Sequence, residues 1–339
     1  MKKLLRWIVC TWLVLTIIVV ASMVYYKGVI NHPLKISKQE KFTIKQGQSV
    51  SSVIDDLADK GKIKSALLLK LYIKTNSQNI VLNPGDFDIN PNMNVAALVK
   101  SMSNSKDPNM VKITIPEGYT VEKIAEILDE KGIIKKNDFL QSCKSYALPS
   151  YISNNPNKKY ALEGYLFPAT YEFKKGSLGK NVIDKMIETF EANMKVIAKE
   201  CNANISESDY EKLVTMASIV EGEIKADDER PIASSVFYNR LKINMKLESC
   251  ATVEYAIGQH KDVLSESDYK FNSPFNTYKV SGLPAGPICS PGKASLMAAI
   301  NPADTKYLYF VSKNDGTHEF NETFEAHNKA VQKYQSKNK

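Results

Sequence analysis

Apolar residues recur at helical spacing after residue 208. We take this stretch as the one around which the rest of the chain is organised. At about 100° per residue the apolar residues share one face of a helix. These residues are Leu213, Met216, Ala217, Val220 and Ile224. Ser208 and Glu211 precede them with the Ser-x-x-Glu spacing of a capping box. The pattern predicts an amphipathic helix, a break at Asp227–Pro231, and a second helix over Ile232–Leu241.

Two glutamates flank the apolar face of the first helix. Glu221 lies roughly 80° to one side of that face and Glu223 roughly 80° to the other. A carboxyl group at such a rim is partly desolvated and keeps its proton more readily. That property suits a general acid. On spacing alone, the plainer interpretation is two surface glutamates.

The N-terminus carries an uncharged, mostly apolar run of 18 residues, Trp7 to Val24. This is about the minimum length for a membrane-spanning helix. The positive charges of Lys2, Lys3 and Arg6 precede it, which predicts a cytoplasmic N-terminus and an extracytoplasmic remainder. The alternative is a cleaved signal peptide. An uncleaved anchor is favoured, because the run is long for a signal peptide and ends without a good cleavage site.

Two stretches of sequence align without gaps at an offset of 71 residues, Phe42–Ile63 and Ile113–Ile134. Each predicts a strand, a Gly turn, and a helix capped by Ser49 or Thr120. The similarity extends to strand-like stretches at 82–87 and 162–167, each before a further helix. A strand–helix–helix–strand module of this size resembles the LysM type, which holds N-acetylated glycans. The alternative is a spacer that sets the distance from the membrane.

The fold class that follows is α+β: an N-terminal transmembrane helix, small LysM-like modules and a mixed α+β catalytic domain. We expect four segments. They are the anchor (1–29), a LysM-like module with its linker (30–108), a second repeat-like module (109–155) and the catalytic domain (156–339). The polar stretch Ser103–Pro108 marks the boundary between the two modules.

Composition excludes several classes of function. The formal charge of +8 is spread along the chain without a finger, P-loop or basic aromatic motif, so nucleic acid is not an expected partner. An anionic membrane or polymer suits the charge equally well. The five cysteines are widely separated and are expected to be free thiols. No metal-binding or serine-nucleophile motif occurs, so neither a metal nor another cofactor is expected.

A Pro- and Gly-rich stretch at 271–292 carries Asn276, Thr277 and Tyr278 in its middle. Amide, hydroxyl and aromatic groups of this kind suit a sugar-binding cleft, although a plain connecting loop is the alternative. Cleavage of a glycosidic bond is the chemistry that fits. Ordinary glycosidases need two carboxyl groups, whereas Glu221 and Glu223 point to opposite rims. One carboxyl group suffices if the substrate supplies its own nucleophile.

Several motifs in register resemble the YceG-like (MltG) family of endolytic murein transglycosylases. They are Leu162–Tyr171 (LEGYLFPATY), Ala217–Glu223 (ASIVEGE), Val236–Leu241 (VFYNRL), Asn276–Tyr278 (NTY), Gly282–Ile288, Asn301–Ala303 and Tyr307–Val311. The resemblance implies cleavage of the MurNAc–GlcNAc bond inside nascent peptidoglycan strands, without water, to leave 1,6-anhydro-MurNAc ends. It assigns Glu221 as the acid and then the base.

The resemblance also implies cleft residues and partners. The expected substrate-binding residues are Glu163, Tyr165, Glu223, Asn239, Arg240, Thr252, Asn276 and Tyr278. Expected partners are peptidoglycan strands, the plasma membrane and peptidoglycan synthases. The alternatives kept open are a non-catalytic glycan-binding scaffold of the cell envelope and a peptidoglycan hydrolase.

The chain departs from the family pattern at two places. Gly222 stands where Lys or a similar residue is common, and Cys250-Ala251 stands where many members carry Asp-Pro. A glycine inside a helix costs about 1 kcal/mol. The helix is therefore expected to end or kink at Gly222, or to allow close approach of the glycan.

Overall fold

The computed structural model describes residues 2–76, 82–103, 109–261 and 263–335. The chain divides into two compact units, Met1–Met110 and Val111–Lys339. The predicted polar boundary is Ser103–Pro108; Ser103 ends the last helix of the first unit, and residues 104–108 lie outside the described residues.

Helix α1 (Lys2–Asn31) contains the apolar run predicted to span a membrane. Within its Cys10–Asn31 portion, an 18-residue window has a mean hydropathy of 2.1, and 6% of that window is buried. Among the described residues, it is the one helix whose length and composition suit a membrane span. The helix continues beyond the apolar run, so Val29 joins the core of the first unit.

The first unit follows the predicted repeat pattern. Strand β1 (Glu40–Ile44) pairs antiparallel with β2 (Gly85–Ile89), and Phe42 lies opposite Phe87 with ring centroids 5.4 Å apart. Its helices are α2 (Val50–Asp59), α3 (Ala66–Asn76) and α4 (Val95–Ser103). The predicted cap is confirmed, because the Ser49 hydroxyl accepts a hydrogen bond from the Ser52 N–H.

The second copy opens the second unit with the same element order. Strand β3 (Met110–Thr114) pairs with β4 (Thr170–Lys174). Its helices are α5 (Val121–Glu130), α6 (Lys136–Ser145) and α7 (Gly179–Glu200). Thr120 caps α5 as predicted, by accepting a hydrogen bond from the Lys123 N–H. This order fits a LysM-like module, but likeness to LysM stays a prediction.

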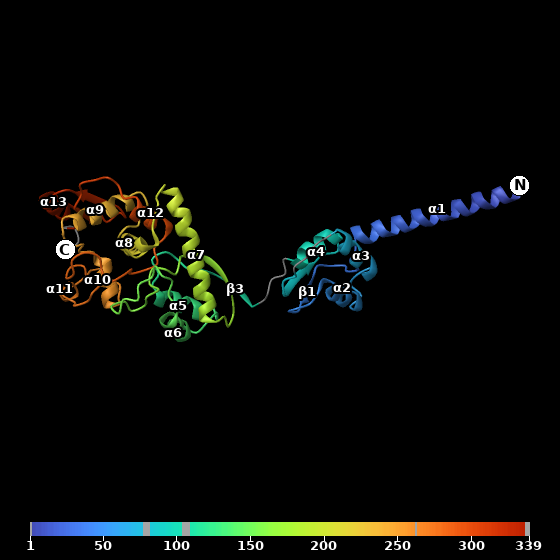
Figure 1. Cartoon of the computed structure of the whole chain (residues 1–339), viewed down its shortest axis with the longest axis horizontal. Helices are drawn as coiled ribbons and strands as arrows, with labels where there is room; N and C mark the ends of the chain where they lie inside the picture. Colours follow the sequence, from blue (N-terminus) through green and yellow to red (C-terminus); the bar gives the residue numbers. More distant parts are fainter. Residues whose placement is uncertain (1, 77–81, 104–108, 262, 336–339) are drawn as a thin grey trace. The chain divides into compact units, whose positions relative to one another are not determined.

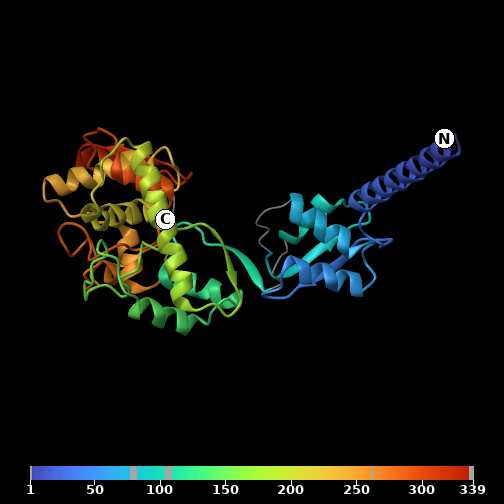
Figure 2. The same cartoon turned by 45° about the vertical axis from the view of Figure 1, so that its right-hand side comes forward.

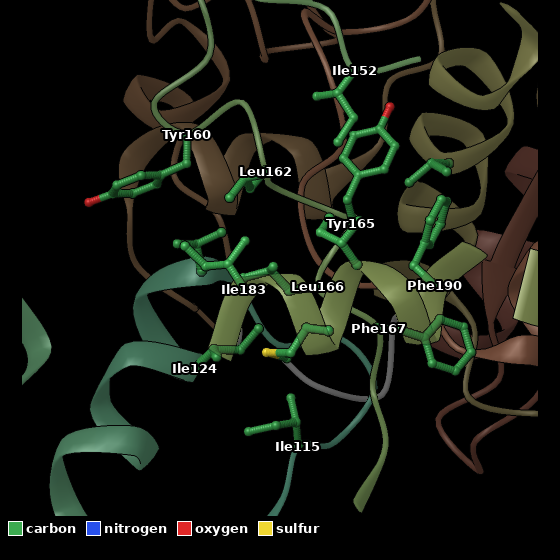
Figure 3. Close-up of a cluster of buried hydrophobic side chains, with 14 of the residues drawn as sticks. Ile115, Ile124, Ile152, Tyr160, Leu162, Tyr165, Leu166, Phe167, Ile183 and Phe190 are labelled. Carbon is green, nitrogen blue, oxygen red and sulfur yellow. The ribbon is translucent and has the colours of Figure 1, made fainter. Parts of the chain in front are cut away.

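The strand expected at 162–167 is wrong, because this stretch forms a buried turn and the strand begins only at Thr170. The turn depends on Gly164, whose φ is +88°. A Cβ there would lie 2.5 Å from the Pro287 Cβ. In Figure 3, Leu162, Tyr165, Leu166 and Phe167 lie among core residues such as Ile115, Ile124, Ile183 and Phe190. Their apolar character therefore reflects burial of the turn rather than a strand.

Helix α8 (Tyr210–Glu223) is the predicted central helix. Ser208 does not cap it, since a 3₁₀ turn (Glu207–Asp209) precedes the helix and Ser206 caps that turn instead. Every residue from Val214 to Val220 is buried. The prediction of an amphipathic helix is therefore wrong for this part of α8. The Ser218 hydroxyl bonds the carbonyl of Thr215 and the N–H of Ile288. The polar side chain of Ser218 therefore makes hydrogen bonds inside the protein, as expected for a helix segment that is buried on every side.

The remaining elements follow α8 in the chain. They are α9 (Arg230–Lys242), α10 (Cys250–Ile257), α11 (Glu266–Tyr269), α12 (Lys293–Ile300), the β5 (Tyr309–Ser312) and β6 (His318–Asn321) hairpin, and α13 (Phe324–Gln335). Helices α9, α10 and α12 pack on α8, and α12 also packs on α7. Figures 1 and 2 show α9, α12 and α13 at one end of this unit and α5 and α6 at the other, with α7 running between them.

Candidate active site

Glu221 stands in the last turn of α8, and its side chain is only 7% exposed. Its Oε2 accepts two hydrogen bonds, from Nη1 of Arg230 and from the N–H of Gly292, each 2.9 Å long. Gly292 is the N-cap residue of α12. The carboxyl group therefore lies at the positive end of that helix, where negative charge is favoured.

Arg230, at the start of α9, is itself buried. Its Nε donates to Oδ1 of Asp227 at 2.9 Å, and Nη1 also donates to the Ser295 hydroxyl. The guanidinium thus joins the end of α8 to α9 and α12. This network fixes the Glu221 carboxyl group in one orientation.

Glu223 serves a different helix. Its Oε1 accepts hydrogen bonds from the N–H of Ala251, at 3.0 Å, and from the Ser249 hydroxyl. These groups form the N-terminus of α10. The two glutamates diverge because their positions on α8 differ by about 200°. Each binds the N-terminus of a separate helix, so they do not form a carboxyl pair.

A cleft of about 700 Å³ opens beside Glu221. It is lined by Gly118, Thr120, Glu122, Lys123, Glu126, Pro156, Asn157, Lys158, Lys159, Tyr160, Glu163, Glu221, Gly222, Ala251, Glu254, Tyr255, Ala256, Gly258, Gln259, His260, Ser273, Pro274, Phe275, Ile288 and Cys289. Polar side chains and three aromatic rings share this lining. The rings of Tyr255 and Phe275 lie 4.8 Å apart and provide an apolar surface. Such a mixture suits a sugar, whose ring has apolar faces and a polar edge.

Gly222 is the last residue but one of α8, so the helix ends beside it, and it packs closely against α10. Close approach of a glycan at Gly222, which lines the cleft, stays a prediction. A Cβ on Gly222 would lie 2.7 Å from the Ala251 Cβ. The absent side chain therefore lets the N-terminus of α10 approach α8, where Glu223 can bind it. The two departures from the family pattern, at Gly222 and at Cys250-Ala251, meet at this contact.

We expect Gly222→Ala to destabilise the fold by about 1 to 3 kcal/mol, since overpacking outweighs the gain in helix propensity. Urea unfolding monitored by circular dichroism measures the change. The double variant Gly222→Ala with Ala251→Gly restores the space and should recover most of the loss. A single variant as stable as the wild type would contradict the close contact.

Glu163 lies in the cleft wall with its carboxyl group buried. It accepts hydrogen bonds from the Val121 N–H, at 2.9 Å, and from the Tyr255 hydroxyl, at 3.1 Å. Burial raises its pKa to about 8, against the opposing effect of these two donors. Glu163 therefore ties the N-terminus of α5 to α10.

This raised pKa makes stability depend on pH. The folded chain binds the Glu163 proton more tightly than the unfolded chain, whose pKa is 4.5. The resulting stabilisation is complete below that value and is lost as the pH rises to about 8. We expect Glu163→Gln to remove this slope, on the order of 1.4 kcal/mol per pH unit. Urea unfolding at several pH values measures it, with the exposed Glu172→Gln as control; an unchanged slope would contradict it.

The other predicted site residues make internal contacts outside the lining of this cleft. Tyr165 is buried and donates to Glu211 at 2.8 Å. Asn239 donates to the carbonyls of Thr305 and Tyr307, and Arg240 to that of Leu308. These contacts fix the segment before β5 against α9.

Three further predicted residues lie near the N-terminus of α10. Thr252 is buried and bonds the Thr277 hydroxyl at 2.8 Å. Asn276 donates to the carbonyls of Tyr269 and Phe271, and the Tyr278 ring packs on that of Tyr269. Contact of Glu223 and of these six residues with a glycan stays a prediction.

Sequence reasoning missed Arg230 and Gly292, the two groups that hold Glu221. Neither residue lies at a sequence spacing from Glu221 that would have predicted a contact with it. Tyr255 and Phe275 were also missed as aromatic wall residues. Within the described parts of the chain, no three His, Cys, Asp or Glu side chains form a group that could hold a metal ion.

The arrangement defines a class of site: one carboxyl group, held by fixed donors, in the wall of a cleft with polar and aromatic lining. Enzymes that cleave glycosidic bonds use a carboxyl group in such a setting as their acid.

Comparisons with known proteins identify the family. The model of the YceG-like family matches residues 42–333. The endolytic murein transglycosylase of Bacillus subtilis (strain 168) is 35% identical over 332 residues, which cover 94% of this chain and 91% of that protein. The protein of the same name from Streptococcus pneumoniae (strain ATCC BAA-255 / R6) is 30% identical over 299 residues, or 79% of this chain and 53% of that protein.

A solved structure agrees with these matches. The crystal structure of a yceG-like protein, lmo1499, from Listeria monocytogenes has a TM-score of 0.57 and 34% identity, and the match covers 86% of this chain and 98% of that one. The chain belongs to the YceG-like family. The family membership predicted from the sequence motifs is confirmed.

Proposed function

We propose that this chain is an endolytic lytic transglycosylase of peptidoglycan, which cleaves the MurNAc–GlcNAc bond inside nascent strands and leaves 1,6-anhydro-MurNAc ends. The observation that carries the proposal is the placement of Glu221, with its carboxyl group held at the wall of the cleft. The curated relatives named endolytic murein transglycosylases support the same reaction class.

Glu221 acts in this proposal as both acid and base. Both of its hydrogen bonds engage Oε2, and Oε1 has no hydrogen-bond partner among the described residues. Oε1 is therefore the oxygen that carries the proton, while Oε2 accepts from Arg230 and Gly292. The Oε1 proton passes to the leaving oxygen of the glycosidic bond, and the C1–O bond breaks.

The nucleophile comes from the substrate. The muramoyl 6-hydroxyl oxygen attacks its own anomeric carbon and forms the 1,6-anhydro ring. Its proton passes to the Glu221 carboxylate, which restores the acid for the next turnover. No second carboxylate is needed for this step, which agrees with Glu223 being bound to the N-terminus of α10.

We also propose roles for the anchor helix and the first module. Helix α1 anchors the protein in the plasma membrane, and the charges of Lys2, Lys3 and Arg6 place the N-terminus in the cytoplasm. The catalytic unit then lies outside, beside peptidoglycan synthases. The first module orients the glycan strand. Unchanged product lengths after deletion of Phe42–Met102 would leave it as a spacer.

Product analysis tests the proposal. The full-length chain in detergent is incubated with uncrosslinked glycan strands, and the fragments are identified by mass spectrometry. The full chain is used because Val29, in α1, belongs to the core of the first unit. Anhydro ends are the expected result. Reducing ends that contain an added water would identify a hydrolase, and binding without cleavage would identify a scaffold.

A further inference from the structure

The first unit follows the apolar run of α1 without an intervening loop. Helix α1 continues unbroken from Lys2 to Asn31, whereas the uncharged run ends at Val24. Val29, only five residues further, is already a buried member of the core of the first unit. Because a helix rises 1.5 Å per residue, about 7.5 Å separate these two valines along the axis. The core of the first unit therefore begins within about one and a half helical turns of the apolar run.

This separation is comparable with the depth of a lipid headgroup layer. The hydrocarbon core of a bilayer is about 30 Å thick and the whole bilayer about 40–45 Å, so each headgroup layer is about 5–8 Å deep. With α1 as the membrane anchor, the first unit lies directly against the bilayer surface. The inference below rests on that proposed anchor.

Helix α3 is the element that adjoins the end of α1. The two helices pack together, and Figure 1 shows α3 beside the point where α1 ends. The chain that leaves α1 also bonds the chain that enters α3. The Lys64 N–H donates to the Pro33 carbonyl at 2.8 Å, and the Lys35 N–H donates to the Lys62 carbonyl at 2.7 Å. Helix α3 therefore begins at the level where α1 enters the first unit.

Helix α3 exposes two leucines on the face opposite its buried face. Leu69 and Ile73 are buried in the core. Leu67 and Leu71 are 76% and 51% exposed. At about 100° per residue, the centres of the two pairs lie about 160° apart around the helix. Lys74, in the last turn, shares the outward face and is exposed. Leucine side chains beside lysine are typical of helices that lie in a membrane interface.

The charge of the first unit suits an anionic surface. Residues 30–103 contain ten Lys residues and six Asp or Glu residues. On α3 itself, Lys70 is paired with Asp55 at 2.6 Å, and Lys74 ends the helix. Lysines beside a membrane-spanning helix are attracted to the phosphate groups of anionic lipids.

The second repeat shows that the module does not need leucines at these places. Helix α6 is the counterpart of α3. Their buried residues correspond in pairs, Leu69 with Phe139 and Ile73 with Cys143. At the same spacing, Asn137 and Gln141 take the places of Leu67 and Leu71, and both are exposed. Of the two copies, the one that continues from α1 is the one that exposes leucines.

We propose that the first unit rests on the membrane through α3: Leu67 and Leu71 enter the headgroup layer of an anionic leaflet, and Lys74 lies among its phosphate groups. Single exposed leucines are ordinary on soluble proteins. This pair lies on the helix that adjoins the anchor, within reach of the bilayer surface. The contact holds the first unit to the membrane at α3 as well as at α1.

Fluorescence quenching in vesicles tests the contact. The chain has two tryptophans, Trp7 and Trp12, both in α1. Both are changed to Phe, and Leu71→Trp then gives a full-length chain with one tryptophan on the outward face of α3. The vesicles contain phosphatidylglycerol, phosphatidylcholine and a lipid with a nitroxide on its headgroup. The nitroxide should quench this tryptophan at least about threefold more than that of the matched Gln141→Trp chain, whose label lies on α6. Equal quenching at the two positions would overturn the proposal.

Two changes then test what holds α3 to the surface. Leu67→Asn, the residue that the second repeat carries, should lower the quenching of the Leu71→Trp chain about twofold. Replacement of phosphatidylglycerol by phosphatidylcholine should also lower it. Undiminished quenching after both changes would overturn the proposal. A blue-shifted emission that the nitroxide does not quench would overturn it too, because protein, such as a second copy of the chain, would then cover the leucines. Circular dichroism checks that each variant is folded.

Flotation and activity separate this inference from the proposed function. Every chain should float with the vesicles after an alkaline carbonate wash, because α1 remains in the bilayer. A chain that floats with an unquenched tryptophan at position 71 would overturn the contact and leave the anchor intact. A chain that does not float would reject the anchor and the contact together. Quenching in a protein that cleaves no glycan strands would support the contact and reject the proposed function.

Discussion

Replacement of Glu221 by Gln is expected to lower the rate of strand cleavage by about 10³-fold or more, since the amide can neither give nor take the proton. The variant keeps a carbonyl oxygen that can accept from Arg230 and Gly292. Its fold and its binding of strands should therefore remain close to wild type. Mass spectrometry of anhydro ends measures the rate, and co-sedimentation with strands measures binding.

Glu223→Gln is the matched control for this change. It lies two residues further along α8, and its carboxyl group binds the N-terminus of α10. A Gln carbonyl can still accept the Ala251 N–H, so cleavage should continue within about tenfold of the wild-type rate. A Glu221→Gln protein that cleaves as fast as Glu223→Gln would rule out Glu221 as the acid.

Replacement of Arg230 by Met is expected to destabilise the second unit by about 3 to 5 kcal/mol, the cost of leaving a buried charge without its partner. The side chains of Arg230 and Glu221 are each only 7% exposed. Denaturant unfolding measures the loss. The pair is coupled, so Glu221→Gln should recover part of the stability in the Arg230→Met background.

Asp227→Asn tests whether the buried partner of Arg230, Glu221, contributes more to stability than its exposed partner, Asp227. Asp227 binds the same guanidinium, but its side chain is 78% exposed. Loss of an exposed pair costs about 1 kcal/mol or less. Equal losses for Asp227→Asn and Arg230→Met would contradict the central place of the Arg230–Glu221 contact.

The repeat was readable from sequence because its signals are local. Ser49 and Thr120 stand directly before their helices and cap them through N–H groups three residues away. The same kind of signal failed at Ser208, where Ser206 began a 3₁₀ turn first. The stretch 162–167 failed for another reason: its apolar residues fill the core as a turn that Gly164 makes possible, and periodicity does not separate that turn from a buried strand.

The candidate acid could be found from sequence, but its surroundings could not. The angle of Glu221 on α8 follows from its position along the helix. Its partners Arg230 and Gly292 come from other elements and meet it only through tertiary packing. Asn239 and Thr252 were predicted to bind substrate, and in the structure their side chains bond neighbouring segments and hold α9 and α10 in place.

The distance along the chain between Glu221 and Gly292 also bears on when the protein becomes competent. A polypeptide is made from its N-terminus, so α1 and both repeats exist well before the start of α12. Until the segment with Ser290 and Gly292 has been made, the Gly118 N–H lacks its partner, the Ser290 carbonyl, and the Glu221 carboxyl group lacks its backbone donor. The order of synthesis therefore delays assembly of the hydrogen bonds around Glu221 until most of the chain is present.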